Sequence, residues 1–196
     1  MKRSKLQMEQ VEWNMLKSEL TPHFLFNSIN VLSQLLLKDK RRSMEFAGRL
    51  SLVYQYFDRH SQREVVALKE ELTFLEHYVY LLKIRYGNAF ALELQLSPKD
   101  KDLAILPCTL QLLVENCIKH NVLSETEPLE ITIRRNGEWL VVENPFRPVP
   151  QLLPASGKGL KNLDARYRLF IHKEISVGLA ENRFVVRVPL SKQVPT

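Results

Sequence analysis

The apolar positions in the first part of the chain recur at the spacing of helices. Leu6, Trp13, Leu16 and Leu20 lie three to seven residues apart, with charged residues between them, as at the entry to a coiled coil. Long helices with short connections predict an antiparallel hairpin, and its exposed apolar stripe would suit dimerisation. Three helices are predicted in this part of the chain. The first ends at about residue 37, the second runs from about 43 to 60 and the third runs from about 68 to 86.

After Gly87 the pattern changes to the alternation of apolar and polar residues that is typical of strands. Asn136-Gly137 predicts a hairpin turn, and Pro107 is expected in the first turn of a helix. The order strand, helix, strand, strand, loop, helix, strand, strand predicts an α/β sandwich, a mixed sheet with helices on one face. The predicted strands are 90–97, 129–135, 138–144, 174–180 and 183–190, and the predicted helices are 108–119 and 160–171.

Composition and charge narrow the class of protein. The chain is 45% hydrophobic and 26% charged, as in an ordinary globular protein. A net charge of +6 suggests nucleic acid or an anionic membrane as a partner. The basic residues are interleaved with acidic ones and form no stripe with aromatic residues, which argues against nucleic acid. Cys108 and Cys117 form no CxxC motif, so a reducing compartment is expected.

No stretch of the sequence reaches the roughly 18 apolar residues that a membrane-spanning helix needs. The first residues, MKRSKLQMEQVEW, carry the charge of a signal peptide but lack its apolar core. If the protein acts at a membrane, we therefore expect the spanning part to lie outside this chain.

The first segment with candidate chemistry is ELTPHFLFNSIN, residues 19–30. Pro22 would interrupt or kink a helix, whereas His23 and Asn27 would share one face if the helix continues. One interpretation is a kinked helix with a packed histidine. The other is a nucleophilic histidine, because the neutral imidazole nitrogen is available near its usual pKa of about 6.5.

The second segment is LQLLVENCIKHN, residues 110–121, where the pair Glu115-Asn116 interrupts an apolar helix. Buried polar groups are costly unless they have partners. Lys119 and His120 follow at a spacing of four residues from Glu115 and Asn116 respectively. Either the polar face of an amphipathic helix begins here, or these side chains supply an oxygen ligand for Mg²⁺ beside a carboxylate, as phosphoryl transfer requires.

The third segment is SGKGLKNLDARYRLF, residues 156–170. Gly157 and Gly159 directly precede a predicted helix, so backbone amides at its N-terminus can meet phosphate oxygens; alternatively, the two glycines serve only the turn. The preceding loop is long and contains four prolines. Such a long loop suggests that residues 146–158 form a lid or a binding element. Positive charge near the same end comes from Lys158, Lys161 and Arg166.

In this order the three segments resemble the cytoplasmic core of LytS-type sensor histidine kinases, which pair with LytTR-type response regulators. The resemblance extends from about residue 15 to residue 190. The first segment is similar to the family's phosphoacceptor segment, the second to the N box of the GHKL ATPase fold and the third to its second glycine box. The resemblance implies a helical dimerisation and phosphotransfer region at residues 1–87 and a Bergerat-type ATP-binding domain at residues 88–196.

The resemblance also implies a reaction, in which a histidine is phosphorylated from Mg²⁺-ATP and the phosphoryl group passes to an aspartate of a response regulator. His23 would be the phosphoacceptor with Asn27 as its helical neighbour, Glu115 the general base and Asn116 the Mg²⁺ ligand. The implied nucleotide-binding positions are Asn116, Lys119, His120, Asn144, Gly157, Gly159, Leu160, Asn162 and Arg166.

The family likewise implies partners and a location. We expect a homodimer formed through the N-terminal helices, a LytTR-type response regulator and a membrane sensor region outside this chain, with no nucleic acid. The expected location is the cytoplasmic side of the bacterial inner membrane.

The sequence departs from the family pattern at two places. Thr21 stands where the family usually has asparagine, and the first glycine box, Asp-x-Gly-x-Gly, is absent. The equivalent strand end reads VVENPFRPVP, so Asn144 replaces the aspartate that reads the adenine amino group, and Pro145 and Phe146 occupy positions of small residues. Besides an active kinase, a degenerate module with weak or no ATP binding and a basic helical adaptor for nucleic acid remain alternatives.

Overall fold

The computed structural model describes residues 24–60, 63–150 and 158–192. The chain forms two compact units, Met1–Ser61 and Gln62–Thr196. The boundary that the sequence suggests between residues 87 and 88 therefore lies inside the second unit. The third predicted helix contacts the helix at residues 109–120 and the short strands at 66–67 and 104–105, and for this reason it belongs with the second unit.

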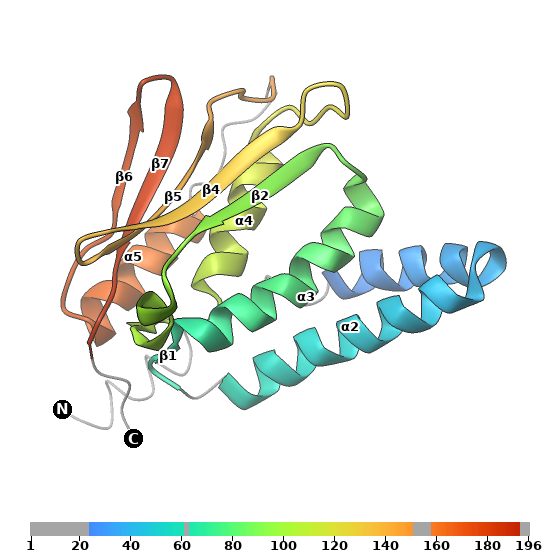
Figure 1. Cartoon of the computed structure of the whole chain (residues 1–196), viewed down its shortest axis with the longest axis horizontal. Coiled ribbons are helices and arrows are strands. Elements are labelled where there is room, and N and C mark those ends of the chain that lie inside the picture. The colour runs from blue at the N-terminus through green and yellow to red at the C-terminus, as the bar shows by residue number, and fades with distance from the viewer. Residues whose placement is uncertain (1–23, 61–62, 151–157, 193–196) are drawn as a thin grey trace. The chain divides into compact units, whose positions relative to one another are not determined.

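The described part of the first unit contains two antiparallel helices, at residues 24–38 and in α2 (Lys40–His60), which lie side by side (Figure 1). α2 begins earlier than the residue 43 expected, because the carboxylate of Asp39 accepts a hydrogen bond of 3.0 Å from the N–H of Arg42. A side-chain oxygen at this position satisfies an amide of the first helical turn. The buried side chains of α2 recur at helical spacing and are Ser43, Phe46, Val53, Tyr56 and His60.

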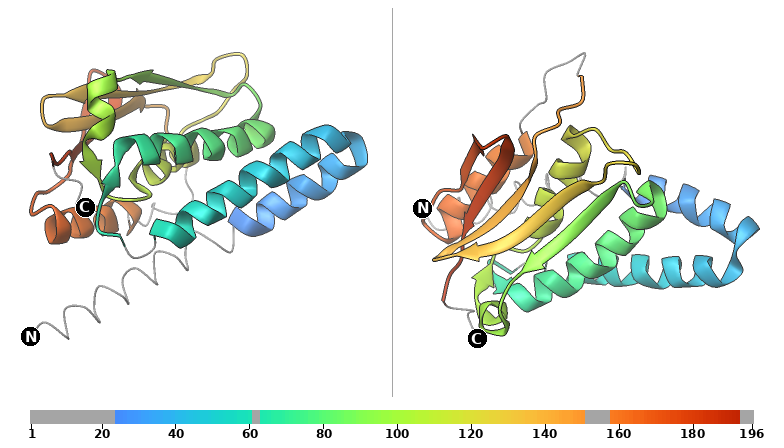
Figure 2. Two further views of the ribbon diagram at one scale, coloured as in Figure 1. Left: turned by 60° about the horizontal axis from the view of Figure 1, so that its bottom comes forward. Right: turned by 45° about the horizontal axis from the view of Figure 1, so that its top comes forward.

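The second unit is built on a mixed sheet of five strands. Its strands are β2 (Phe90–Gln95), β4 (Leu129–Asn136), β5 (Trp139–Pro145), β6 (Ser176–Ala180) and β7 (Arg183–Pro189), and its helices are α3 (Leu68–Tyr86), α4 (Thr109–His120) and α5 (Lys158–Phe170). The strand order is β2-β4-β5-β7-β6, with β2 parallel to β4 and the other neighbours antiparallel. All three helices lie on one face of the sheet (Figures 1 and 2). The predicted α/β sandwich is confirmed.

Three short elements of the second unit are absent from the prediction. β1 (Val66–Ala67) pairs antiparallel with β3 (Ala104–Ile105), and the 3₁₀ helix η1 (Pro98–Asp102) connects β2 to β3. Strands of two residues are too short to show the alternation of apolar and polar residues, so the sequence pattern cannot predict them. The β1-β3 ribbon nevertheless matters for the site, because it ties the start of α3 to the segment that leads into α4.

Two tight turns set the register of the antiparallel strands. β4 ends at Asn136, so the first hairpin loop consists of Gly137 and Glu138 and lies one residue later than predicted. Gly137 has a φ of 62°, a value that glycine adopts without steric cost. Glu181 and Asn182 connect β6 to β7 with φ values of 49° and 60°, as a two-residue hairpin turn of this hand requires.

The core of the second unit lies between the sheet and its helices. Phe74 of α3, Leu110 and Leu113 of α4, and Tyr167 of α5 are fully or almost fully buried there. Each helix therefore has a fixed face toward the sheet. This packing also holds the polar residues of the same helices in place. Within the described ranges, no helix combines the length and apolar character needed to cross a membrane.

Candidate active site

A buried carboxylate fixes the start of α4, the helix that carries Glu115 and Asn116. Glu71 of α3 is fully buried, and its two oxygens accept hydrogen bonds from the N–H groups of Cys108 (2.7 Å) and Leu110 (3.1 Å). The first amides of a helix lack partners within the helix, and a carboxylate there also faces the positive end of the helix dipole. α4 is thus positioned by α3.

The residues before α4 differ from the sequence expectation. α4 begins at Thr109, so Pro107 precedes the helix and does not occupy its first turn. Cys108 is the N-cap and has a left-handed backbone with a φ of 63°. Burial, and then the negative charge of Glu71, raise the pKa of the Cys108 thiol, so this cysteine stays protonated and unreactive.

Glu115 is held by two side-chain donors that the sequence patterns do not reveal. The hydroxyl of Tyr78, from α3, donates a hydrogen bond of 3.1 Å to Oε2 of Glu115. The amide nitrogen of Gln111, one turn earlier in α4, donates to the same oxygen over 2.7 Å. Burial, followed by the charge of Glu115, raises the pKa of Tyr78 well above its usual range, so the hydroxyl keeps its proton and remains a donor.

Asn116 and Gly159 bring the second and third sequence segments together. A Cβ atom on Gly159, near the start of α5, would lie 3.9 Å from both the Nδ2 and the Oδ1 of Asn116. The Nδ2 of Asn116 is buried and has no hydrogen-bond partner among the described residues. A buried donor without a partner is costly, so this amide favours a ligand that supplies an acceptor beside the start of α5.

Asn144 lies at the end of β5, on the same face of the strand as the core residues Leu140 and Val142. Its side chain is completely buried. The Nδ2 donates to the carbonyl of Pro145 over 2.6 Å, while the Oδ1 has no partner within the described part of the chain. The amide is therefore fixed with its acceptor free to take a hydrogen bond from a ligand.

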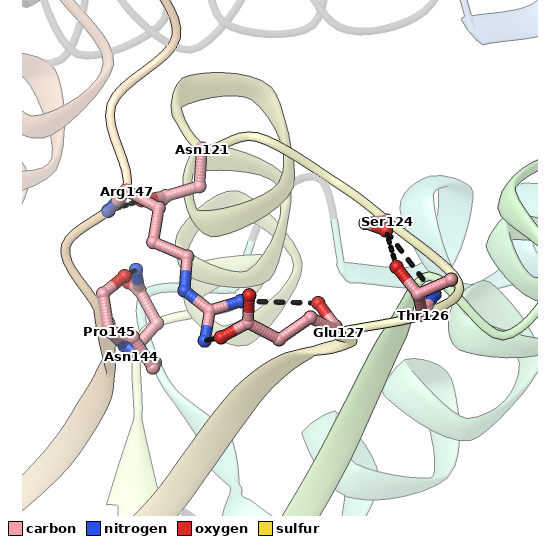
Figure 3. Close-up of polar contacts among 7 residues, drawn as sticks. All are labelled: Asn121, Ser124, Thr126, Glu127, Asn144, Pro145 and Arg147. Atoms are coloured by element: carbon pink, nitrogen blue, oxygen red, sulfur yellow. Dashed lines mark hydrogen bonds and ion pairs between the residues drawn. The ribbon is translucent and has the colours of Figure 1, made fainter.

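The segment after β5 is bonded to the C-terminal end of α4 (Figure 3). The N–H of Arg147 donates to Oδ1 of Asn121 over 2.8 Å, and its carbonyl accepts from Val122 over 2.7 Å. The N–H of Val149 donates to the carbonyl of His120 over 3.1 Å. The guanidinium of Arg147 contacts the carbonyl and the carboxylate of Glu127. These bonds hold Asn144 and α4 in one framework.

The remaining residues of α4 lie near its end. Lys119 is exposed and His120 is half-buried. Burial, with a smaller contribution from Lys119, lowers the pKa of His120, which favours the neutral imidazole at neutral pH. Both side chains follow Glu115 and Asn116 by one helical turn, as the sequence spacing indicates.

The predicted residues of α5 have two kinds of placement. Leu160 and Asn162 are half-buried near the start of the helix. Arg166 is buried, and its Nη2 donates a hydrogen bond of 3.0 Å to the carbonyl of Pro107. This contact ties α5 to the residues just before α4 and gives Arg166 a structural role in the frame of the site.

Two of the expected residues, His23 and Gly157, lie outside the described residues, as do Thr21 and Pro22 and most of the expected lid. Asn27 is described: it lies half-buried in the helix at residues 24–38. The structure therefore brings Asn116 close to Gly159 and bonds the segment after Asn144 to the end of α4, and the phosphoacceptor segment stays a sequence prediction.

The chemistry of these residues fits ATP and Mg²⁺. Asn144 presents a buried acceptor suited to an exocyclic amine, and Asn116 presents an amide beside the N-terminus of α5, where phosphate is favoured. No cluster of three histidine, cysteine or acidic side chains that could hold a metal occurs within the described ranges. Mg²⁺ is commonly bound by one or two protein oxygens together with substrate phosphates, so a single Asn116 oxygen would suffice.

Comparison with known proteins finds similarity to histidine kinases. Residues 11–90 match the family model described as "Histidine kinase". Sensor histidine kinase BtsS of Escherichia coli (strain K12) is 28% identical over 202 residues, a match that covers 95% of this chain and 35% of BtsS. Sensor protein LytS of Staphylococcus haemolyticus is 30% identical over 146 residues, covering 68% of this chain and 25% of LytS. The chain is a relative of the LytS-type sensor histidine kinases.

This kinship confirms the resemblance drawn from the three sequence segments. The chain spans about a third of the length of BtsS and a quarter of the length of LytS. The segment at residues 11–90, which matches the histidine kinase model, is followed by the strands and helices that carry Glu115, Asn116 and Asn144.

Proposed function

We propose that this chain is the kinase core of a two-component sensor, which phosphorylates His23 from Mg²⁺-ATP and passes the phosphoryl group to an aspartate of a response regulator. The observation that carries the proposal is the approach of Asn116 to Gly159. It brings a potential Mg²⁺ ligand and a helix N-terminus suited to phosphate to one place, next to the carboxylate of Glu115.

The chemical step is an in-line displacement. A ring nitrogen of His23 forms a bond to the γ-phosphorus while the bond to the ADP oxygen breaks, and the ring proton passes to Glu115. Asn116 would hold Mg²⁺, which supplies charge neutralisation at the phosphates. The chain's part is then mainly positioning and electrostatic stabilisation, to which the positive residues Lys158 and Lys161 contribute.

Recognition of the adenine amine by Asn144 would be weaker than by the usual aspartate. A neutral hydrogen bond contributes about 0.5–1.5 kcal/mol, compared with about 1.5–3 kcal/mol for a charged one. The difference of about 1 kcal/mol corresponds to roughly a five- to tenfold loss of affinity. ATP binding should therefore be weakened but retained, provided that Phe146 stacks on the base and does not block it.

The first unit supports the proposed dimer. Its helices expose several large apolar side chains, among them Phe26 (68% exposed) and Met44 (67% exposed), and apolar surface on helices commonly marks an interaction site. We propose that a second copy covers this surface, that a LytTR-type regulator receives the phosphoryl group and that a membrane sensor region belongs to the whole protein. The chain would then act on the cytoplasmic side of the bacterial inner membrane.

The proposal is tested with the chain dimerised by an N-terminal coiled coil and incubated with radiolabelled Mg²⁺-ATP. We expect acid-labile phosphate on the protein, none in His23→Gln and little in Asn116→Ala. His172→Asn, at an exposed position outside the candidate site, serves as a control for loss of a histidine elsewhere. Absence of acid-labile phosphate on the dimerised protein, or its persistence in His23→Gln, would contradict the proposal.

A degenerate kinase that signals by conformational change and partner binding is the second candidate. The observation that favours it is the replacement of the first glycine box by Asn144-Pro145-Phe146. Calorimetric titration with a non-hydrolysable ATP analogue and Mg²⁺ separates the two candidates. Dissociation constants below about 0.1 mM favour the active kinase, whereas absent binding by the folded protein favours the degenerate module.

A further inference from the structure

Tyr78 reaches the proposed general base from a different helix and from 37 positions away in the sequence. It lies in α3 with only 2% of its surface exposed, and its ring packs against Phe74 with 6.1 Å between the ring centroids. The hydroxyl is thus carried on a rigid, buried ring. It donates to Oε2 of Glu115 over 3.1 Å.

Gln111 completes the arrangement around the same oxygen. It is also 2% exposed, and its Nε2 donates to Oε2 of Glu115 over 2.7 Å. Both donors therefore act on one oxygen of the carboxylate. No hydrogen bond to the other oxygen, Oε1, is found within the described ranges, so this oxygen is left to accept a proton.

The energetics distinguish this cluster from ordinary packing. A phenylalanine at position 78 would fill nearly the same volume without burying a hydroxyl, and the Oε1 of Gln111 already lies buried without a partner among the described residues. Polar groups in such a place cost free energy unless their hydrogen bonds are used. Their use here is to fix the carboxylate of Glu115, which has no other side-chain donor in the described part of the chain.

We infer that Tyr78 and Gln111 are positioning residues, which hold Oε2 of Glu115 and so leave Oε1 free to accept the proton released in the phosphorylation step. This inference rests on the proposed function, because it assigns a purpose to the contacts of the proposed base. A displacement of a catalytic group by about 1 Å can cost up to a hundredfold in rate. The two hydrogen bonds prevent the carboxylate from turning away.

The test compares Tyr78→Phe with Tyr167→Phe in the dimerised chain. Tyr167 is a matched control, because it is also buried and its hydroxyl also contacts α4, at Thr109 over 3.3 Å, but it does not reach Glu115. We expect the phosphorylation rate of His23 at saturating ATP to fall about tenfold in Tyr78→Phe and less than about twofold in Tyr167→Phe. The affinity for the ATP analogue should be unchanged in both.

A double-mutant cycle excludes a merely structural effect. If Tyr78 acts through Glu115, adding Tyr78→Phe to Glu115→Gln should not lower the residual rate further. Gln111→Met, which removes the other donor and keeps the length of the side chain, should lower the rate in the same way as Tyr78→Phe.

The possible failures are distinguishable. An unchanged rate in Tyr78→Phe, an equal loss in Tyr167→Phe or a further loss in the Glu115→Gln background overturns the inference while the kinase function stands. If the unaltered protein forms no phosphohistidine, the proposed function fails and the inference fails with it.

Discussion

The N–H of Arg147 donates a hydrogen bond of 2.8 Å to Oδ1 of Asn121 (Figure 3). This bond joins the end of α4 to the segment that replaces the first glycine box. Glycine boxes rely on backbone freedom, whereas this chain has proline on either side of Phe146-Arg147 and holds the segment by hydrogen bonds. The position of Asn144 thus depends on the side chain of Asn121, the residue that follows α4.

Asn121→Ala should weaken binding of an ATP analogue about fivefold, because two hydrogen bonds of Asn121, to Arg147 and Cys117, are lost. Asn121→Asp keeps the acceptor and should show the smaller effect. Ser124→Ala is the control, since its 2.7 Å contact with Thr126 lies on the exposed neighbouring loop. Calorimetric titration measures the three variants, and equal affinity in all of them would contradict the expectation.

Gly159→Ala should reduce affinity for the ATP analogue about fivefold without lowering Tm. The added methyl group would sit 3.9 Å from the Asn116 amide, an ordinary contact distance, so the folded chain tolerates it. It would nevertheless occupy volume that a phosphate needs. Gly48→Ala in α2, where nothing lies within 4 Å, is the matched helical control and should leave affinity unchanged in the same titration. A drop in Tm for Gly159→Ala would contradict this explanation.

Glu71→Gln should lower the free energy of unfolding by about 1.5–3 kcal/mol, the usual contribution of a hydrogen bond to a charged group. Glutamine has one acceptor where Glu71 uses two, for Cys108 and Leu110, and its NH₂ group would face an amide donor. Urea denaturation measures the change. Glu70→Gln, at the start of the same helix, should have a much smaller effect, and comparable losses would refute the assignment.

Asp100 should contribute stability that depends on pH. Hydrogen bonds from the Arg135 guanidinium and from Ser97 lower the pKa of Asp100 below its usual 3.8. The contribution is present above the pKa of the unfolded chain and is lost as the pH falls through the folded value. Asp100→Asn should therefore be less stable than the unaltered protein at pH 7, and the difference should shrink below about pH 4.

Thermal or urea unfolding at several pH values checks this prediction. Asp102→Asn is the control, because the Asp102 side chain is 74% exposed and forms an ion pair with Lys69 at the surface. A difference between the unaltered protein and Asp100→Asn that stays constant from pH 7 to pH 3 would contradict the role given to Asp100.

The sequence predicts the long elements of this fold well, because their periodicity is local. The helix predicted at about residues 68–86 is α3, Leu68–Tyr86, and apart from η1 and β3 the order and type of the elements from β2 to β7 agree with the prediction. The misplaced details depend on single side chains. Asp39 starts α2 early, and Cys108 with its left-handed backbone moves the start of α4 beyond Pro107.

The candidate site can be proposed from the sequence where its residues form a contiguous motif. Glu115, Asn116 and Gly159 stand out as polar or flexible residues at informative positions in a sequence. Tyr78 and Gln111 do not, because a tyrosine and a glutamine on helices are compatible with many environments. The role proposed for them depends on hydrogen bonds to Glu115 that only the folded chain establishes.

The division of the chain between residues 61 and 62 bears on how such a protein can be recombined in evolution. α3 supplies Glu71 to the amides that open α4 and Tyr78 to the carboxylate within it. Recombination between two related sequences at residue 61 would keep α3 and α4 from the same parent and so preserve these bonds. Recombination at residue 87 would combine α4 with an α3 from the other parent. Chimaeric descendants that fold should therefore have exchanged their parts at the earlier junction.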